Sequence, residues 1–217
     1  MKYLALSVAL AGAISGGFVQ ASLAQDWSGF YAGVLAGYGS GELKGATPAG
    51  AFASTTSFSG ALLGGTLGAN YQTGSFVVGV EGDVAWSGMT GSKACVGAPA
   101  QTCSIDVHWM STLRARAGYT IDDLMVFATA GLSMANGTAK TSPASGGTTG
   151  SDTQTFVGWA AGLGAEYMVA ENVSLKLDYL YSDWGSRTSP INTVAAGSAY
   201  VGSPTSHAVR VGLNYRF

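Results

Sequence analysis

Charge is scarce in this sequence. Its 217 residues include 10 Lys and Arg and 12 Asp and Glu, so charged residues make up 10% of the chain. That share is about 40% of what a typical soluble domain carries. The formal net charge is only −2, and so weak an imbalance argues against nucleic acid as a partner.

Long apolar runs are also lacking beyond the first two dozen residues. No later segment reaches the roughly 18 apolar residues that a membrane-spanning helix needs. Glycine, at 33 of 217 residues, disfavours helices throughout. These absences leave two classes for a hydrophobic, exported chain: a soluble β-sandwich or barrel, or an outer-membrane barrel.

Export is predicted from the first 24 residues. Lys2 precedes an uncharged run over residues 3–19, and Ser22-Leu23-Ala24 offers a small-x-small cleavage site. This layout is typical of a secretory signal peptide, so we expect a signal peptide over residues 1–24 and a mature domain over residues 25–217. The alternative is a membrane-anchor helix, but the run is short for a span and no stop-transfer charges follow it.

Motifs for catalysis are missing. The chain has no Gly-x-Ser-x-Gly, and no His, Asp and Ser stand at a persuasive spacing. Asp106 and His108 are predicted to share the inward face near an external loop, where a hydrolase or acyltransferase could place its site. Because ordinary rim roles explain these residues as well, we predict that the protein is not an enzyme.

Ligands for a metal or cofactor are few. His108 and His207 are the two histidines, and imidazole binds zinc or haem iron. They are predicted near the outer rim, on opposite strands and with side chains that point to different faces of the wall. This arrangement disfavours binding of one metal or haem by both. We predict no cofactor and no metal, and keep haem binding as an alternative.

Cysteine occurs only twice, as Cys95 and Cys103, both in a predicted external loop. Two close cysteines in an exported chain predict one disulfide. On the chain-entropy account, such a bond stabilises the loop by about 2.5 kcal/mol. A metal or redox pair would need further ligands or a Cys-x-x-Cys spacing, which are absent.

What the sequence does have is alternation. In the last nine residues, Val209–Phe217, apolar and polar side chains alternate, which indicates a strand with one apolar face. An apolar strand at the end of a soluble chain would recruit other chains, whereas in a closed barrel the last strand pairs with the first. Similar period-two segments predict eight strands, at about residues 27–39, 58–71, 75–87, 105–120, 124–136, 153–169, 173–184 and 206–217.

The spacers between these strands are alternately long and short. The short spacers are residues 72–74, 121–123 and 170–172, and the long ones include Gly137–Thr153, which is predicted to be a solvated loop. Bacterial outer-membrane barrels have this asymmetry of tight periplasmic turns and long external loops. The fold class predicted is therefore all-β: an eight-stranded antiparallel up-and-down transmembrane barrel with both termini in the periplasm.

Successive side chains of a strand point to opposite faces. In the strand centres, the charged side chains occupy the alternate positions of one face, and the apolar side chains occupy those of the other. A midplane Arg or Lys that faced lipid would cost about 2–4 kcal/mol, so the charges are predicted to face the barrel interior. The outward set is Val78, Val80, Val84, Trp86, Trp109, Leu113, Ala115, Tyr119, Val157, Trp159, Leu163, Tyr167, Val173, Leu175, Leu177 and Tyr179. The predicted inward ion-pair network is Glu81, Asp83, Arg114, Arg116, Glu166, Lys176, Asp178 and Arg210.

This network has two interpretations. Eight strands leave an interior just wide enough for side chains, so four carboxylates and four cations can form a structural plug. The alternative is a narrow polar pore whose ion pairs rearrange to pass ions. We favour the plug.

Aromatic side chains are predicted to form two girdles at the level of the lipid headgroups. One lies near the termini and short turns, and the other nearer the long loops. The first comprises Trp27, Tyr71, Phe76, Tyr119, Tyr167, Tyr215 and Phe217, and the second Tyr38, Trp86, Trp109, Trp159, Tyr179 and Tyr181.

Three segments resemble a known family: WSGFYAGVLAGYG (Trp27–Gly39), SLKLDYLYSDWG (Ser174–Gly185) and HAVRVGLNYRF (His207–Phe217). They look like the small eight-stranded outer-membrane barrels, which include the OmpA transmembrane domain, the opacity-type proteins and the alphaproteobacterial major surface antigens. The resemblance implies that the terminal Phe217, with Tyr215 on the same strand, is read by the barrel-assembly machinery.

The function expected is a surface-exposed structural protein that supports envelope integrity, in contact with outer-membrane lipids and lipopolysaccharide. Two alternatives stay open: a porin-like channel for small solutes, and a loop-based binder of haem or host surfaces. A rival of another class is a soluble lipocalin-like barrel, in which apolar residues would face inward and charges outward.

Overall fold

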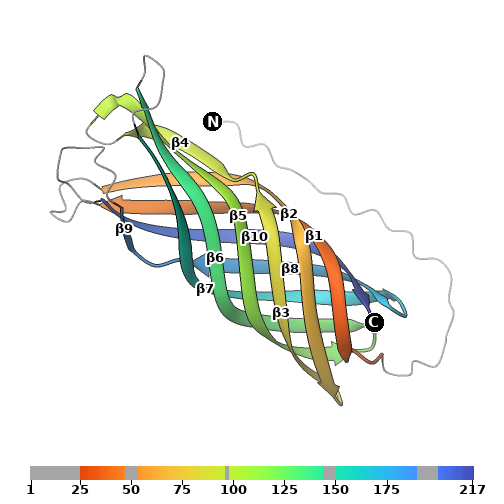
Figure 1. Cartoon of the computed structure of the whole chain (residues 1–217). Helices are drawn as coiled ribbons and strands as arrows, with labels where there is room; N and C mark the ends of the chain where they lie inside the picture. The colour runs from red at the N-terminus through yellow and green to blue at the C-terminus, as the bar shows by residue number, and fades with distance from the viewer. Residues whose placement is uncertain (1–24, 47–52, 96–97, 144–149, 190–199) are drawn as a thin grey trace, which may run out of the picture.

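The computed structural model describes residues 25–46, 53–95, 98–143, 150–189 and 200–217, which form a barrel of antiparallel strands (Figure 1). The predicted signal peptide and its cleavage site lie outside these ranges. The wall consists of β1 (Gly29–Ala46), β2 (Ala53–Thr73), β3 (Phe76–Ser87), β5 (Ala98–Ile121), β6 (Leu124–Pro143), β7 (Gly150–Ala170), β8 (Val173–Asp183) and β10 (Tyr200–Arg216). Two short strands, β4 (Thr90–Cys95) and β9 (Arg187–Ser189), are added at one end.

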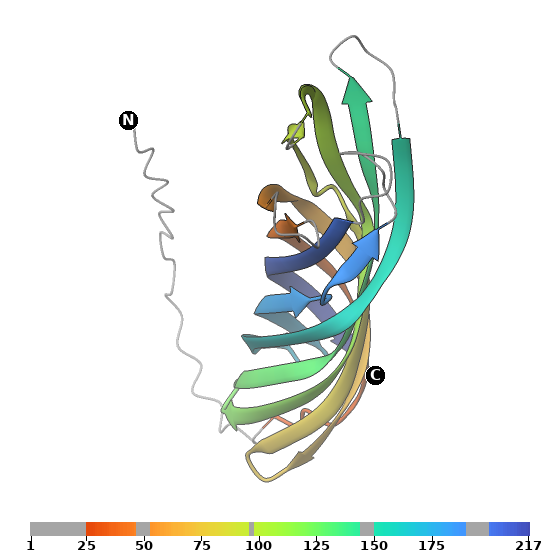
Figure 2. The same ribbon diagram turned by 90° about the vertical axis from the view of Figure 1, so that its left-hand side faces the viewer.

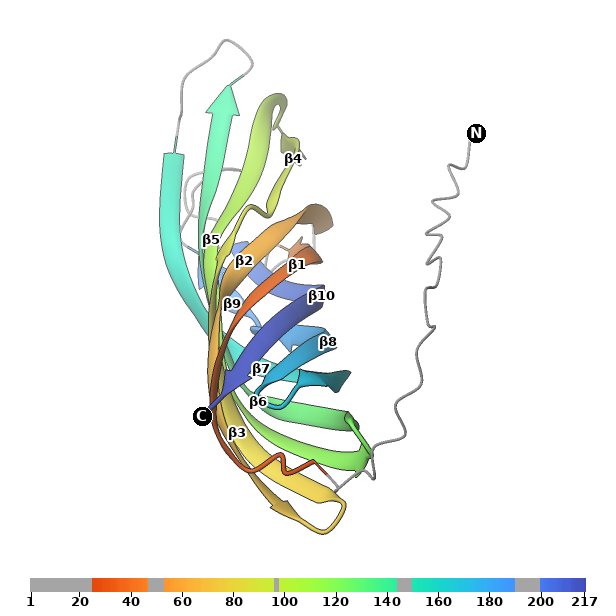
Figure 3. The ribbon, with the colours of Figure 1, turned by 90° about the vertical axis from the view of Figure 1, so that its right-hand side faces the viewer.

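The eight long strands close into a ring. Each is paired with its neighbours in chain order, and β10 returns to pair with β1 along its whole length, from Tyr31↔Arg216 to Ala46↔Val201. Figure 3 shows β10 lying between β1 and β8. The predicted closure of the last strand onto the first is confirmed. No helix among the described residues is long and apolar enough to cross a membrane.

One end of the barrel carries three tight turns. The turns are the two-residue connections Gly74-Ser75, Asp122-Asp123 and Glu171-Asn172, as the short spacers predict. Gly74 and Asp122 adopt left-handed backbone conformations, with φ of 59° and 52°, which glycine and aspartate tolerate in hairpin turns. The C-terminus and the start of β1 lie at this same end (Figure 1).

At the other end the strands continue beyond the predicted boundaries. β6 runs to Pro143 and β7 starts at Gly150, so the prediction of a solvated loop over Gly137–Thr153 is wrong for most of that segment. Its Ser, Thr and Gly residues lack an apolar period, but their backbone groups pair regularly across the hairpin. Figure 2 shows this hairpin and the one formed by β4 and β5 extending past the ends of β1 and β10.

The wall is apolar outside, and its charged strand-centre residues face inward. All sixteen residues of the predicted outward set are exposed or half-exposed on the barrel surface. The strand residues between them are buried or partly buried, and burial alternates along β3 and β8. This is the reverse of a soluble lipocalin-like barrel, so that rival is excluded.

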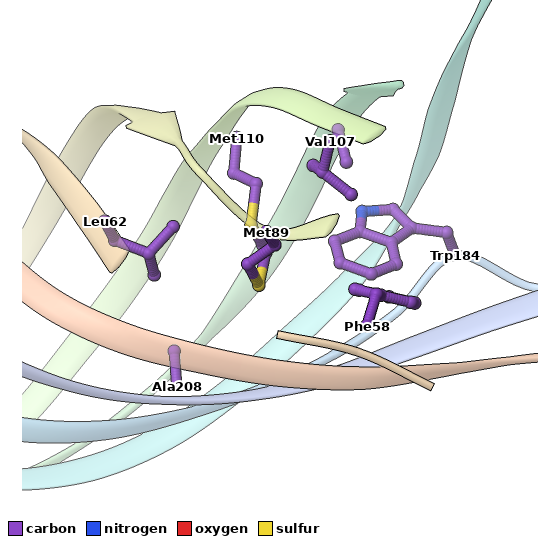
Figure 4. Packing of buried hydrophobic residues seen from close by; sticks show 8 residues of the cluster. Phe58, Leu62, Met89, Val107, Met110, Trp184 and Ala208 are labelled. Carbon is purple, nitrogen blue, oxygen red and sulfur yellow. The ribbon is translucent and has the colours of Figure 1, made fainter. Parts of the chain in front are cut away.

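The interior is layered along its axis. Near the short turns, an inner apolar layer of Trp27, Val77, Met125, Phe127 and Met168 fills the bore. Near the extended strands, the outer apolar layer consists of Phe58, Leu62, Met89, Val107, Met110, Ala135, Trp184 and Ala208 (Figure 4). The charged side chains lie between these two layers.

The inner layer corrects the assignment of one aromatic residue. Trp27 was expected in the girdle near the termini, but its side chain is fully buried in the bore, with the guanidinium of Arg216 4.8 Å above its ring. Trp27 precedes β1, so strand parity does not govern its direction. The other six aromatic residues of that girdle are exposed on the outer surface.

Candidate functional site

The candidate site is the ionic cluster in the middle of the bore. The structure places all eight residues of the predicted network there, on β3, β5, β7, β8 and β10, and each is buried. Their side chains face inward because each alternates with outward apolar neighbours, such as Val80 and Val84 around Glu81 and Asp83. Charges buried in this way must be paired and hydrogen-bonded.

Arg114 is the centre of the cluster. Its Nη2 atom lies 2.6 Å from Glu81 Oε1 and 2.7 Å from Asp83 Oδ2 on the adjacent strand. Its Nε and Nη1 donate hydrogen bonds to the hydroxyl groups of Thr112 and Thr129, at 2.8 and 2.9 Å. All three guanidinium nitrogens are therefore engaged, and the predicted pairing between the third and fourth wall strands is present.

Other ion pairs cross the bore. Lys176 on β8 places its Nζ 2.7 Å from Glu81 Oε2 on β3, which lies four strands away around the ring. Arg210 on β10 pairs with Asp178 on its neighbour β8 and reaches Asp83 on β3 at 3.2 Å. These contacts join opposite sides of the wall, so the cluster braces the barrel across its bore.

A second branch of the cluster is organised around Arg116. Its guanidinium pairs with Glu166 on β7 and lies 3.9 Å from the ring centroid of Phe127. Glu166 also accepts hydrogen bonds from Ser174 and Asn214, at 2.5 and 2.8 Å. Both ionic and cation–π contacts thus hold Arg116 against the inner apolar layer.

Tyr31 joins the two branches, although the sequence reasoning did not assign it a role. Its hydroxyl donates to Glu81 Oε2 at 2.8 Å and accepts from Arg116 Nη1 at 3.2 Å. The ring fits because Gly68 opposite has no side chain: a Cβ there would lie 2.3 Å from Tyr31 Cζ. Two features of the sequence could have indicated this role of Tyr31. The alternation along β1 turns its side chain inward, and the even spacing of glycines in β2 leaves space for its ring.

A ninth charge was also missed. Arg216 is buried below Arg116, donates to the backbone oxygen of Asp26 at 2.8 Å, and has no salt-bridge partner in the part of the chain that the structure describes. The parity of Val209–Phe217 places it inward with Arg210. With it, the buried charged residues in the described part of the chain are five cations and four carboxylates, a net charge of +1.

Several buried polar atoms in or near the cluster have no hydrogen-bond partner among the described residues. They include Arg116 Nε, Asp178 Oδ1, Asn214 Oδ1 and both side-chain amide atoms of Asn70. Buried polar atoms without partners are expected to bind water. The middle of the bore is therefore a polar layer between two apolar ones.

The histidines lie elsewhere. Asp106 and His108 were predicted to share the inward face, and this is wrong. Ile105 and Val107 pack inward before a β-bulge between Val107 and Trp109, so Asp106 points away from the bore and His108 is exposed. His108 contacts Thr138 Oγ1 at 2.8 Å, and His207 contacts the Tyr179 hydroxyl at 2.5 Å. Their strands, β5 and β10, are on opposite sides of the ring, and the described residues include no group of three potential metal ligands.

The remaining predicted residues lie at the two ends. Cys103 is on β5, beside β4, which ends at Cys95; the side chain of Cys95 is outside the described residues, so the disulfide stays a prediction. At the short-turn end, Tyr215 and Phe217 are exposed and pack edge to face, with ring centroids 5.4 Å apart. The Phe217 backbone N–H donates to Phe30 O, which fixes the last residue to β1.

Comparison with known proteins gives consistent results. Residues 6–217 match the family model described as outer membrane protein beta-barrel domain. A 31 kDa outer-membrane immunogenic protein of Brucella melitensis is 38% identical over 211 residues, covering 88% of this chain and 84% of that protein. A 22 kDa outer membrane protein of Rhizobium leguminosarum is 28% identical, with 89% and 80% covered.

Among solved structures, the outer membrane protein OprG from Pseudomonas aeruginosa has a TM-score of 0.57. It is 15% identical, and the match covers 88% of this chain and 96% of OprG. At that identity, the likeness shows the fold alone.

Proposed function

Since this chain belongs to the outer membrane protein β-barrel family and is an integral barrel of a bacterial outer membrane, we propose that it is a structural, surface-exposed protein that supports the integrity of the envelope. In this proposal the barrel is closed to ions in its resting state. The relatives named above are outer-membrane and immunogenic proteins rather than enzymes, which supports a non-enzymatic role.

The observation that carries this proposal is the filling of the bore. Ion pairs such as Lys176–Glu81 and Arg210–Asp83 connect opposite walls, and apolar layers lie above and below them. An ion that crossed the bore would have to separate several buried pairs and enter two apolar layers. Both steps are costly in a medium of low dielectric constant.

The proposed orientation places the short turns and both ends of the mature chain in the periplasm and the extended strands outside. Short turns on the periplasmic side and long external segments are the rule for bacterial barrels. The projecting β4–β5 and β6–β7 hairpins would then be the surface presented to the outside, as expected of an immunogenic protein such as the Brucella relative.

The proposed partners follow from the surfaces. The apolar outer wall with its aromatic girdles suits outer-membrane lipids and lipopolysaccharide. The exposed Tyr215 and Phe217 on the last strand suit recognition by the barrel-assembly machinery. We expect Phe217→Ala to lower the amount of heat-modifiable barrel in outer-membrane fractions, while Phe76→Ala, at a similarly exposed ring near the same end, leaves it unchanged.

Two measurements test the proposed role. Deletion of the gene should sensitise cells to detergents and large antibiotics, and the wild-type chain should restore resistance. Purified protein in planar bilayers should show no channel openings over many insertions. An unchanged deletion strain would refute the envelope role, and regular openings would refute the closed bore.

The second candidate is a small-solute porin. The unpartnered polar atoms of Arg116, Asp178 and Asn214 favour it, because they lie in a polar layer through which ions could move if the apolar layers opened. The net charge of +1 in the bore then predicts a preference for anions. Binding of haem or of a host surface by the external segments remains a third proposal, which a haem titration with His108→Ala and His207→Ala variants would test.

A further inference from the structure

A groove lies on the outer surface of the wall near the outer rim, away from the bore. Its volume is about 590 Å³, which is within the range of about 300–1,000 Å³ that is typical of ligand sites. The lining comes from β1, β2, β4, β8 and β10. Gly41 and Phe58 are its buried residues, and the other lining side chains are exposed or half-exposed, so the groove opens to the outside of the barrel.

One row of residues runs along this groove across five strands. The register places Tyr181 on β8 opposite His207 on β10, and His207 opposite Ser40 on β1. Ser40 in turn lies opposite Ser59 on β2, which lies opposite Thr90 on β4. The short side chains of Ser40 and Ser59 leave space in the middle of the row. The rings of Tyr181 and His207 stand beside that space, with their centroids 5.1 Å apart.

The groove lies at the level of the lipid headgroups. Tyr38 and Tyr179 are two residues nearer the short-turn end on β1 and β8, in the outer aromatic girdle, and such rings settle at that level. The Tyr38 hydroxyl donates to Ser59 Oγ at 3.0 Å, and the Tyr179 hydroxyl lies 2.5 Å from His207 Nδ1. Two strand residues span about 7 Å, so the row begins just beyond the girdle. The β4–β5 and β6–β7 hairpins project past the ends of β1 and β10, so the groove is on the lower side of the rim (Figure 2).

The lining is rich in hydroxyl groups and carries little net charge. Serine and threonine hydroxyls both donate and accept hydrogen bonds, which suits the hydroxyl groups of a sugar. The lysine of the lining, Lys44, has its Nζ 3.8 Å from Glu42 Oε2, so a carboxylate accompanies the cation. The Tyr181 ring contacts those of Trp159 and His207, which hold it as a platform for the apolar C–H face of a sugar ring. These features favour an uncharged saccharide over a ligand recognised through phosphate groups, which would call for arginine or several lysines.

We propose that the groove binds the core saccharide of a lipopolysaccharide molecule that lies beside the barrel. This inference deepens the proposed lipid partnership and rests on the proposed orientation, which puts the extended strands outside. The sugar hydroxyls exchange hydrogen bonds with Ser40, Ser57 and Glu42, and one sugar ring packs on Tyr181. The acyl chains of the same molecule lie on the apolar wall below the groove, against exposed residues such as Val209.

The test titrates the barrel with three probes: rough-type lipopolysaccharide from the native bacterium, its lipid A, and the core oligosaccharide released from it. The protein is refolded in detergent micelles without lipopolysaccharide. The rings of its two histidines are labelled with ¹³C, and His108→Ala assigns their resonances. We expect lipopolysaccharide to shift the His207 resonance saturably and to bind about tenfold more tightly than lipid A, because lipid A lacks the sugars that contact the groove.

His108 is the internal control, because it is exposed on β5, on the opposite side of the ring from β10. A ligand in the groove leaves its resonance in place. Equal shifts of both histidines would show a general change of the micelle and overturn the proposal, as would lipid A that binds as tightly as lipopolysaccharide. Free core oligosaccharide that binds as tightly as lipopolysaccharide would overturn the membrane-anchored source of the ligand.

A filling variant supplies the second test. Ser40→Tyr places a ring in the middle of the row and should weaken lipopolysaccharide binding about tenfold, to the level of lipid A. Ser151→Tyr, at an exposed position of β7 three strands away from β1 around the ring, should leave it unchanged. Heat-modifiable gel mobility checks that each barrel has formed. Should Ser40→Tyr fail to fold, Ser57→Tyr replaces it, and undiminished binding by the folded variant would refute the proposal.

The binding test is separate from the tests of the proposed function. It uses purified molecules, so its result depends neither on the orientation of the barrel in cells nor on the phenotype of a deletion strain. Loss of the core-dependent binding would remove the groove as a saccharide site and leave the envelope role standing. An unchanged deletion strain would refute the envelope role and leave the binding in place.

Discussion

Single residues decide whether the bore is filled by a stable cluster or by unpaired charges. Arg114 contacts two carboxylates and two hydroxyl groups, and Tyr31 connects Glu81 to Arg116. Each of these side chains is buried, so removal of one leaves its partners buried without that counter-charge or hydrogen bond. The stability of the barrel should therefore depend on these positions far more than on ion pairs at the rim.

Arg114→Met tests this dependence. The change leaves Glu81 and Asp83 with fewer counter-charges in the bore, and we expect a loss of about 3–5 kcal/mol in the free energy of unfolding. Lys140→Met is the matched control, since the Lys140–Asp106 pair is partly exposed, and should cost about 1 kcal/mol or less. Urea unfolding in lipid vesicles, followed by gel mobility, measures both; equal losses would contradict the prediction.

Gly68→Ala tests the space that Tyr31 occupies. The added methyl group meets the phenol ring at 2.3 Å, so the ring must leave its position between Glu81 and Arg116. We expect a loss of about 1–3 kcal/mol from overpacking. Gly65→Ala, whose Cβ would have 3.5 Å to its nearest neighbour, is the control, and Tyr31→Leu in the Gly68→Ala background should recover part of the loss.

At the scale of elements, the strands have two different parts. The part between the girdles obeys a strict apolar and polar alternation, because one face meets lipid and the other meets the cluster. The outer part, such as β6 beyond Asn136, pairs just as regularly but is rich in Thr, Ser and Gly. In the proposed orientation this part lies outside the membrane, where neither face of the strand has to meet lipid. Backbone pairing alone then holds the strand, and no apolar alternation marks it in the sequence.

The β4–β5 hairpin is the element that the predicted disulfide would stabilise. Cys95 and Cys103 lie on these two paired strands. If they are joined, Cys95→Ser with Cys103→Ser should cost about 2–3 kcal/mol of local stability, seen as faster proteolysis at the adjacent Lys93, with unchanged heat-modifiable mobility. Mass spectrometry after alkylation checks the bond directly, and two alkylated thiols in protein prepared without reductant would refute it.

At the scale of the molecule, closure and the two unlike ends define how the barrel sits in its membrane. The short-turn end carries Gly74-Ser75 and the C-terminus, and the other end carries the projecting hairpins (Figure 1). Only one of these ends can face the periplasm. In the proposed orientation, the end with the short turns faces the periplasm.

Labelling of single cysteines on intact cells tests the orientation. In a background with both native cysteines replaced by serine, we expect Ser92→Cys on β4 to react with an impermeant maleimide. Ser75→Cys in the short turn should react only after the outer membrane is opened, although both positions are exposed on the protein. Labelling of Ser75→Cys on intact cells would reverse the proposed orientation.

Much of this architecture was predictable because a bilayer imposes one requirement on each strand: the residues that face lipid must be apolar. The alternation around Glu81 and Asp83, or along Val209–Phe217, indicates which side chains face lipid and which face the bore. The short turns lie where this alternation ends. The sequence by itself thus determined the strand number, the facing of the wall and the set of charges in the bore.

Only the tertiary structure decided what those inward side chains do together. The pairing of Lys176 with Glu81 across the bore, the burial of Trp27 and Arg216, and the two apolar layers all depend on which strands face one another once the ring closes. The bulge at His108 is likewise a local departure from strand parity. Parity along a strand is a local property, whereas contacts across a bore join residues far apart in the chain, and no pattern along the sequence encodes them.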